Sequence, residues 1–166
     1  MKIEKAARID LVDVLFLLKE CVSSMNKKGL KHWNNAYPGS EIMVGAIEEG
    51  SLYLYKELGI VKGMIILSKD EPEEYKNIDW KLKSDKALYL KFLSIHPNWQ
   101  KGDIGKELIE FAENYAKENG MHTVRTDVYG GVDSANNLGS KLGFTQAGEF
   151  HSSFQSMPYL AYEKGI

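Results

Sequence analysis

The stretch from Ala87 to Glu118 constrains the fold more than any other part of the chain. A near-continuous apolar run over residues 87–95 closes at His96-Pro97, and a short glycine-containing loop follows it. Such a run is typical of a buried strand. After the loop, apolar residues recur at helical spacing, which predicts an amphipathic helix that ends at Asn119-Gly120. The residues on its apolar face are Ile104, Leu108, Phe111, Ala112 and Tyr115.

The spacing of apolar residues and the positions of turn residues also predict the remaining elements. Asp10 and Ser40 are placed to cap two helices, which Gly29 and Gly50 end. The other expected elements are a strand near Ile3, a hairpin of strands 51–56 and 60–67 through Leu58-Gly59, a charged surface loop over 69–86 with one helical turn after Pro72, a strand over 123–129, a helix over 134–142, and strands over 144–150 and 157–163.

This order of elements indicates the fold class. Strands first pair by hairpin and later alternate with helices, which predicts an α/β fold of the α+β type, with a central mixed sheet of about seven strands and helices on both faces. The chain has 166 residues and no internal repeat. We therefore expect a single domain over residues 1–166.

Composition excludes several classes of protein. Lys and Arg total 21 against 23 Asp and Glu, a net charge of −2, whereas a domain that binds nucleic acid normally carries a basic excess. The single cysteine, Cys21, agrees with a reducing compartment, and its apolar neighbours favour a buried small side chain over a nucleophile. The N-terminus has no signal-peptide pattern, and the run Leu11–Leu18 is too short to span a bilayer. We expect a cytoplasmic protein that contacts neither nucleic acid nor membrane.

The loop after the 87–95 strand carries the most chemistry. Backbone N–H groups at a helix N-terminus lack partners and sit at the positive end of the helix dipole. Glycines let a ligand approach the backbone, and Lys101 and Lys106 add positive charge, so the loop can cradle a diphosphate. Neither the Walker A spacing nor the Gly-x-Gly-x-x-Gly pattern is present. An ordinary connection whose glycines serve the turn explains the local pattern equally well.

With these residues, the chain resembles the GNAT superfamily of acetyl-CoA-dependent N-acetyltransferases over nearly its whole length. The resemblance rests on the element order, the strand exit Ile95-His96-Pro97, the loop from Gln100 to Lys106, and the helix exit Leu142-Gly143-Phe144. Three further segments are similar to an uncharacterised-type bacterial subgroup: His32 to Pro38, Ile78-Asp79-Trp80, and Ala161 to Lys164.

The resemblance implies a GNAT fold, acetyl-CoA as cofactor, and a strand that bulges to offer backbone groups to the pantetheine arm. By position, the implied pantetheine contacts are Leu93, Ser94 and Ile95. The implied pyrophosphate contacts are Gln100, Lys101, Gly102, Asp103, Ile104, Gly105 and Lys106, and Asn136 is a further candidate for the cofactor site.

Two departures from the family pattern bear on activity. Asp103 stands where the family has its first loop glycine; it favours a helix start but opposes a diphosphate. Gly139 stands where many members have a tyrosine that protonates the departing thiolate, and Val132 replaces a frequent asparagine. Tyr129 and Tyr159 are the candidates for a substitute proton donor, and each is equally a candidate for a packed aromatic. Asn136 or Asn137 is placed to replace the asparagine, or to lie on a solvated helix face.

The acceptor side is less defined. Four aromatics fall in segments that correspond to the family's acceptor-side elements: Trp33, Tyr37, Tyr75 and Trp80. They line an aromatic pocket, or Trp33 and Trp80 only anchor the loops. The residues whose type suits a general base are Glu149, His151, His96 and Asp127. His96 precedes a proline and fits a structural role better. Family members often deprotonate the amine through water, so no base need be visible. No metal site is expected.

These features together predict an N-acetyltransferase that moves acetyl from acetyl-CoA to a primary amine, by direct transfer in a ternary complex. A small-molecule amine is preferred over a protein tail, and a homodimer is left open. A rival hypothesis is a degenerate, non-catalytic CoA-binding or sensing module, because Asp103, Val132 and Gly139 all depart from the family. A third is a structural interaction partner that uses no cofactor.

Overall fold

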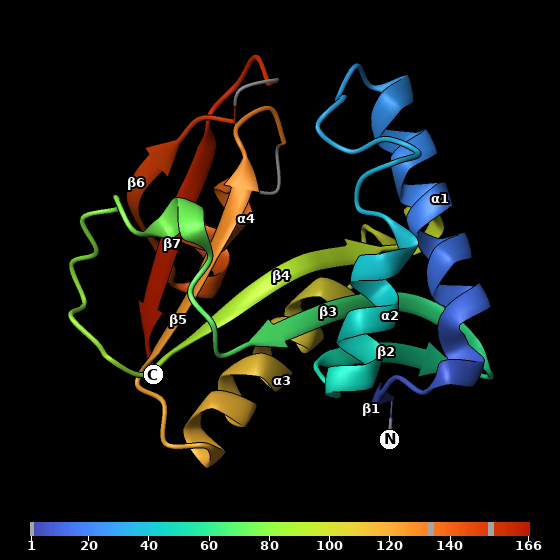
Figure 1. Cartoon of the computed structure of the whole chain (residues 1–166), viewed down its shortest axis with the longest axis horizontal. Helices are drawn as coiled ribbons and strands as arrows, with labels where there is room; N and C mark the ends of the chain where they lie inside the picture. Colours follow the sequence, from blue (N-terminus) through green and yellow to red (C-terminus); the bar gives the residue numbers. More distant parts are fainter. Residues whose placement is uncertain (1, 133–134, 153–154) are drawn as a thin grey trace. The chain divides into compact units, whose positions relative to one another are not determined.

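The computed structural model describes residues 2–132, 135–152 and 155–166. Its helices are α1 (Leu11–Lys27), α2 (Ser40–Glu49), α3 (Ile104–Glu118) and α4 (Ala135–Leu142) (Figure 1). Its strands are β1 (Ile3–Lys5), β2 (Leu52–Glu57), β3 (Ile60–Ser68), β4 (Ala87–Ile95), β5 (Thr123–Tyr129), β6 (Thr145–Phe150) and β7 (Tyr159–Gly165). Single helical turns lie at Arg8–Asp10, Glu73–Tyr75 and Pro97–Trp99.

The strands form a mixed sheet in the order β1-β2-β3-β4-β5-β7-β6. The β1–β2, β2–β3, β5–β7 and β6–β7 pairs are antiparallel, and β4 and β5 run parallel, with Ala87 opposite Thr123 and Leu90 opposite Thr126. The predicted mixed sheet of seven strands is confirmed. The chain divides into two compact units, residues 1–67 with 92–111 and residues 68–91 with 112–166, which are described in turn.

The first unit packs helices on both faces of the β2–β3 hairpin. On one face, the apolar sides of α1 and α2 cover alternate strand residues, as a period of two requires. On the other face, the rings of Tyr53 and Phe111 lie 5.0 Å apart, and Gly63 faces Ile104 and Leu108 of α3. The fully buried residues of the first face include Val14, Leu17, Met43, Leu52, Leu54 and Met64.

The second unit anchors the charged segment 69–86 on β5 and β7. The buried Glu163 carboxylate accepts the N–H groups of Lys81 (2.8 Å) and Leu82 (3.2 Å). Arg125 donates from Nη2 to the Leu82 carbonyl (2.8 Å), and its guanidinium lies 4.5 Å from the Trp80 ring centroid. The helical turn expected after Pro72 is present, at Glu73–Tyr75. The segment is thus a surface loop with buried anchors rather than a free loop.

The predicted helix caps were wrong in detail. Asp10 is the N-cap residue of α1, as predicted, but its carboxylate accepts the Ala7 N–H (2.7 Å) and a Lys56 ammonium proton (2.7 Å) instead of an N–H of α1. Gly39, not Ser40, is the N-cap of α2. Strand β6 starts one residue later than expected, because Gly143 is left-handed (φ +77°) and the Phe144 N–H still bonds to the Leu138 carbonyl.

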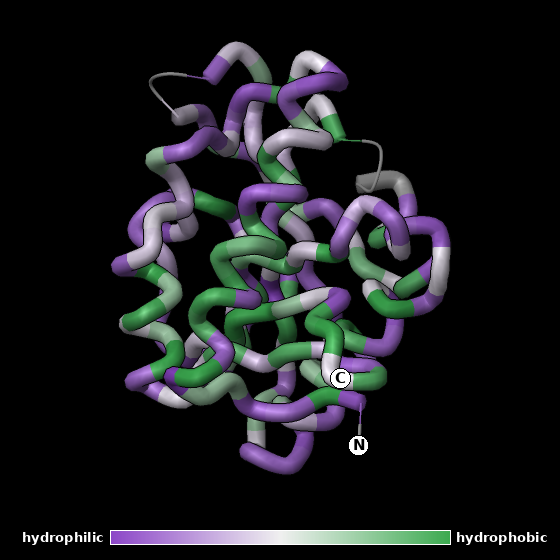
Figure 2. The backbone as a smooth tube through the Cα atoms, turned by 90° about the vertical axis from the view of Figure 1, so that its right-hand side faces the viewer, coloured by the Kyte–Doolittle hydropathy of each residue, from purple (hydrophilic) through white to green (hydrophobic). Residues whose placement is uncertain are grey.

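Among the described residues, no helix is long and apolar enough to cross a membrane. The backbone accordingly changes between hydrophobic and hydrophilic stretches over short distances (Figure 2).

Candidate functional site

Strand β4 changes its backbone conformation at Phe92, just before the three residues expected to meet pantetheine. Phe92 is one of two described non-glycine residues in the left-handed region, with φ of +52°. The Ser94 hydroxyl donates to the Phe92 carbonyl (3.0 Å) and holds the distortion. A side-chain-bearing residue in this region is uncommon and marks a built irregularity. After it, Leu93 is exposed and Ser94 is buried, so the end of β4 presents Leu93 outward.

The Ile95 carbonyl at the end of β4 is fully engaged by the protein itself. Cys21 on α1 donates its thiol hydrogen to this oxygen (Sγ to O 3.3 Å), and the Gln100 amide donates from the loop (3.0 Å). Burial raises the pKa of the Cys21 thiol to about 12, so it stays a protonated donor. A carbonyl oxygen has two lone pairs, and both are used here. Cys21 is buried as expected, and its link to β4 has no signal in the sequence.

The loop after β4 is a compact turn. His96 Nδ1 accepts the Asn98 N–H (3.2 Å), and the His96 and Trp99 rings meet edge-on at 4.9 Å. The Lys62 ammonium lies 4.8 Å from the Trp99 ring centroid, and the Gly102 N–H bonds to the Trp99 carbonyl (3.3 Å). His96 therefore caps a turn, which agrees with the structural role expected for it.

Helix α3 begins directly after this loop, at Ile104. The Asp103 carbonyl accepts the Glu107 N–H (2.9 Å), so Asp103 immediately precedes the first helical turn. Asp103 and Lys101 are exposed, Ile104 is buried, and Lys106 lies 3.7 Å from Glu110. The N–H groups of the first turn of a helix have no carbonyl partners within it, so this terminus can receive an anion.

The glycines of the loop fit an approaching diphosphate. A Cβ added at Gly102 would meet only the Trp99 carbonyl at 3.6 Å, and one at Gly105 only Ile95 Cγ1 at 3.9 Å. Both are ordinary contacts, and neither glycine is left-handed. The fold therefore requires glycine at neither position. By contrast, a Cβ at Gly63 would lie 3.0 Å from Ile104 and Ile95.

The two candidate catalytic tyrosines face each other across β5 and β7. Tyr129 is directly opposite Tyr159, with ring centroids 5.2 Å apart. The Tyr129 hydroxyl accepts the Met157 N–H (3.2 Å) and lies 3.3 Å from Ser156 Oγ. The Tyr159 ring stacks on Phe150 at 5.2 Å. The structure brings the pair together and also gives each a packing role.

Helix α4 carries the departures from the family pattern. Gly139 is exposed, and a Cβ there would meet only the Phe144 carbonyl, at 3.6 Å. Val132 lies before the helix, where its N–H bonds to the Tyr129 carbonyl. Asn137 is exposed. The side chain of Asn136 lies outside the described part of the chain.

The predicted acceptor residues fall into different units. Trp33 and Tyr37 both pack on Phe92, with ring centroids 5.8 and 5.9 Å away, so the first unit brings them to the distorted part of β4. Trp80 is buried in the second unit, 5.3 Å from the Tyr75 ring. Trp80 thus anchors the 69–86 segment.

Of the residues expected to suit a general base, Asp127 is partly buried and lies next to Tyr75. The buried Tyr75 donates its hydroxyl proton to Asp127 Oδ2 (2.6 Å). Burial raises the pKa of Asp127, and this hydrogen bond offsets the rise only in part. Glu149 and His151 form an exposed pair 3.9 Å apart. The Tyr75–Asp127 contact has no local sequence signal. The described residues hold no group of three or more His, Cys, Asp or Glu side chains able to bind a metal.

Comparison with known proteins decides the family. The pattern of the Acetyltransferase (GNAT) family matches residues 18–144. The chain belongs to this family. As a GNAT acetyltransferase it is an enzyme that acts on an acceptor, and the family resemblance inferred from its sequence is confirmed.

Solved acetyltransferase structures share the fold. A GNAT-family acetyltransferase from Listeria monocytogenes is 22% identical, with a TM-score of 0.77, covering 99% of this chain and 94% of the other. One from Streptococcus agalactiae is 18% identical, with a TM-score of 0.81 and the same coverage. A ribosomal-protein-alanine N-acetyltransferase from Brucella melitensis is 18% identical, with a TM-score of 0.74 and 100% coverage of both chains. No curated protein matches the chain.

Proposed function

We propose that this GNAT enzyme transfers acetyl from acetyl-CoA directly to the primary amine of a small molecule, in a ternary complex. The observation that carries the proposal is the start of α3, where the fold requires glycine neither at Gly102 in the preceding loop nor at Gly105 in the first turn. We also propose that it works in the cytoplasm as a single domain over residues 1–166, with Cys21 reduced.

The proposed cofactor site uses backbone more than side chains. The N–H groups of the first turn of α3 would hold the pyrophosphate, with Lys101 and Lys106 supplying positive charge. Gly102 and Gly105 would leave the backbone accessible. Leu93 and Ser94 would meet pantetheine, since the Ile95 carbonyl already has two donors. Gln100 would act by fixing the loop to β4 rather than by touching phosphate.

Acetyl-CoA, when bound, supplies an acetyl group activated as a thioester. The amine nitrogen forms a bond to the carbonyl carbon and the carbon–sulfur bond breaks, while the nitrogen loses a proton and the sulfur gains one. An ammonium with a pKa of about 10 must first be deprotonated, whereas a thiol of pKa about 8.5 leaves without much help. The chain therefore needs a base more than an acid, and positioning supplies much of the rate.

We propose one residue for each of these two proton transfers. Asp127 is the proposed base, because its raised pKa brings it closer to that of the ammonium it must deprotonate. Tyr129 is the proposed acid ahead of Tyr159, because its hydroxyl accepts the Met157 N–H, and a hydrogen bond to that oxygen stabilises the phenolate left after proton donation.

The test is a panel of primary amines with acetyl-CoA, read by release of free thiol. Wild type is expected to turn over at least one amine. Asp127→Asn is expected to lower kcat by about 10²–10⁴-fold and Tyr129→Phe to lower it by less, because the thiol leaves without much help; CoA affinity should be unchanged in both. Tight CoA binding without turnover of any amine would instead support a CoA-binding module. Full activity of both variants would contradict the two assignments.

A further inference from the structure

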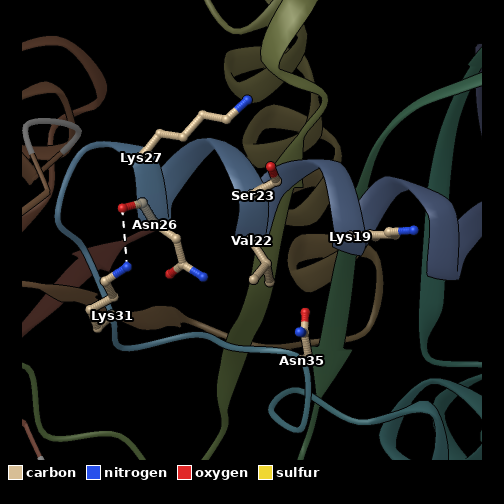
Figure 3. Close-up of a pocket in the computed structure, with 7 residues that line it drawn as sticks. All are labelled: Lys19, Val22, Ser23, Asn26, Lys27, Lys31 and Asn35. Carbon is tan, nitrogen blue, oxygen red and sulfur yellow. Dashed lines mark hydrogen bonds between the residues drawn. The ribbon is translucent and has the colours of Figure 1, made fainter.

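The first unit has a hollow of about 440 Å³ between the second half of α1 and the segment that follows it. Val22 forms its apolar wall, and Lys31 and Asn35 line it from the segment. Figure 3 shows Asn35 facing Val22 across the hollow, with Lys19 toward one end and Lys31 toward the other. Lys27 extends along the rim, away from the interior.

The hollow is positively charged. Three of its lining residues are lysines and none is acidic. Among the described residues, Lys19 and Lys27 form no ion pair, and Lys31 donates only to the Asn26 backbone carbonyl (3.3 Å). Residues 19–35 contain four lysines and one glutamate, in a chain whose net charge is −2. Such a local excess attracts anions over roughly a Debye length, about 8 Å at physiological salt.

Both walls of the hollow also touch the end of β4. On the helix side, Cys21 precedes Val22 and donates to the Ile95 carbonyl. On the segment side, Trp33 and Tyr37 pack on Phe92. The hollow therefore adjoins the strand that we propose holds the pantetheine arm.

We propose that this hollow binds an oxyanion on the acceptor, so that the substrate is a primary amine that also carries a carboxylate or a phosphate. Lys19, Lys31 and the Asn35 amide would bind the anion, Lys27 would add positive charge at the rim, and Val22 would contact the carbon chain between anion and amine. The role of this anion site in catalysis rests on the proposed acetyl transfer. The amide-shift titration below tests anion binding without it.

The experiment pairs amines that differ only in the anion: phosphoethanolamine with ethanolamine, and β-alanine with propylamine. Thiol release gives kcat/KM for each. In parallel, phosphoethanolamine and β-alanine are titrated into ¹⁵N-labelled protein with saturating CoA, and amide shifts of residues 19–35 are followed. The variants are K19Q/K27Q/K31Q, the charge-preserving K19R/K27R/K31R, and a control, K69Q/K86Q/K117Q, at three exposed lysines of the other unit.

We expect an anionic amine to be preferred over its neutral partner by about tenfold or more, since several exposed charge contacts of modest strength act together. The preference should disappear in the glutamine triple variant, through KM, and persist in the arginine and control variants. A preference for phosphoethanolamine over ethanolamine would identify the anion as a phosphate, and a preference for β-alanine over propylamine would identify it as a carboxylate.

Turnover without anion preference would overturn the inference and leave acetyl transfer standing. Shifts in residues 19–35 that vanish only in K19Q/K27Q/K31Q, without turnover of any amine, would support the anion site and count against the proposed function. If the titrations produce no amide shifts in residues 19–35 and the assay shows no preference for the anionic amine, the inference is overturned.

Discussion

Gly63 and Gly105 differ in what a Cβ atom would meet at each position. At Gly105, on the first turn of α3, the nearest atom would lie 3.9 Å away, whereas at Gly63 three side-chain carbons would lie within 3.2 Å. Gly105→Ala should leave unfolding unchanged or stabilise the protein by up to about 1 kcal/mol. Gly63→Ala should destabilise it by about 1–3 kcal/mol. Thermal unfolding without ligand measures both, and a large loss for Gly105→Ala would mean that the fold needs that glycine.

Asp103 and Lys101 are exposed neighbours of opposite charge at the proposed pyrophosphate site. Asp103→Gly should tighten CoA binding several-fold, because a carboxylate about 4 Å from a phosphate costs roughly 1 kcal/mol in water. Replacing an N-cap aspartate by glycine costs only a few tenths of a kcal/mol of helix stability. Lys101→Ala should weaken binding. Calorimetric titration of CoA gives both constants; if neither moves, this loop does not bind the diphosphate.

Asp127 should make stability depend on pH. Its folded-state pKa is raised by burial, so the folded protein holds the proton more tightly than the unfolded chain does. The contribution of Asp127 to stability should therefore be fully present below the ordinary aspartate value of about 3.9 and be lost as pH rises through the higher folded value. Asp127→Asn still accepts the Tyr75 hydrogen bond and should remove this loss, which thermal melts from pH 3 to 8 would show.

The matched control is the exposed Asp79, whose pKa Lys81 and Lys83 lower. Asp79→Asn should change the profile little, and with the opposite sign. Equal profiles for wild type and Asp127→Asn would contradict the burial of this carboxylate.

Helix α4 offers a gain-of-function prediction. Gly139 is exposed, and a side chain there would meet no closer neighbour than the Phe144 carbonyl at 3.6 Å. Gly139→Tyr should therefore fold and, if the family's proton donor acts from this position, raise kcat by about tenfold or more. Gly139→Phe is the matched control, with the same ring and no hydroxyl. Equal kcat for the two variants in the thiol-release assay would show that no acid acts from α4.

At the scale of elements, periodicity predicted most of what the structure contains. The β4 strand and the β5 strand have the predicted bounds, since each is an apolar run between turn residues. Asp10 is the N-cap of α1 as predicted, although its carboxylate bonds elsewhere, whereas the N-cap of α2 is Gly39 and not Ser40. A carboxylate or hydroxyl near a helix start has several possible backbone partners, which the sequence does not rank. The left-handed Phe92 has no signal in the sequence, since phenylalanine normally avoids that conformation.

Contacts between residues far apart in the chain could not be predicted from the sequence either. Tyr75 and Asp127 are 52 residues apart, and Leu82 and Glu163 are 81 apart. Local pattern assigned the 69–86 segment to a surface loop, because its charges outnumber the two aromatics that anchor it. The Cys21 contact with Ile95 spans 74 residues. Such pairs depend on tertiary packing, which neither periodicity nor spacing reports.

For the molecule as a whole, family membership follows from motifs spread over most of the chain, and the match over residues 18–144 agrees. Gly102 and Gly105 supply the physical reason for a cofactor at the start of α3, because the packing of the fold does not require glycine at either position. The acceptor is less constrained by the sequence, since its proposed residues lie on segments far apart in the chain.

The most direct measurement is calorimetric titration of acetyl-CoA into wild type and into the Gly105→Trp variant, with circular dichroism confirming that both are folded. The account predicts binding by wild type with a dissociation constant on the order of micromolar, about −8 kcal/mol. It predicts no detectable binding by the variant, because the indole would occupy the space before α3. No binding by wild type up to millimolar acetyl-CoA, or equal binding by both, would contradict the proposed cofactor site.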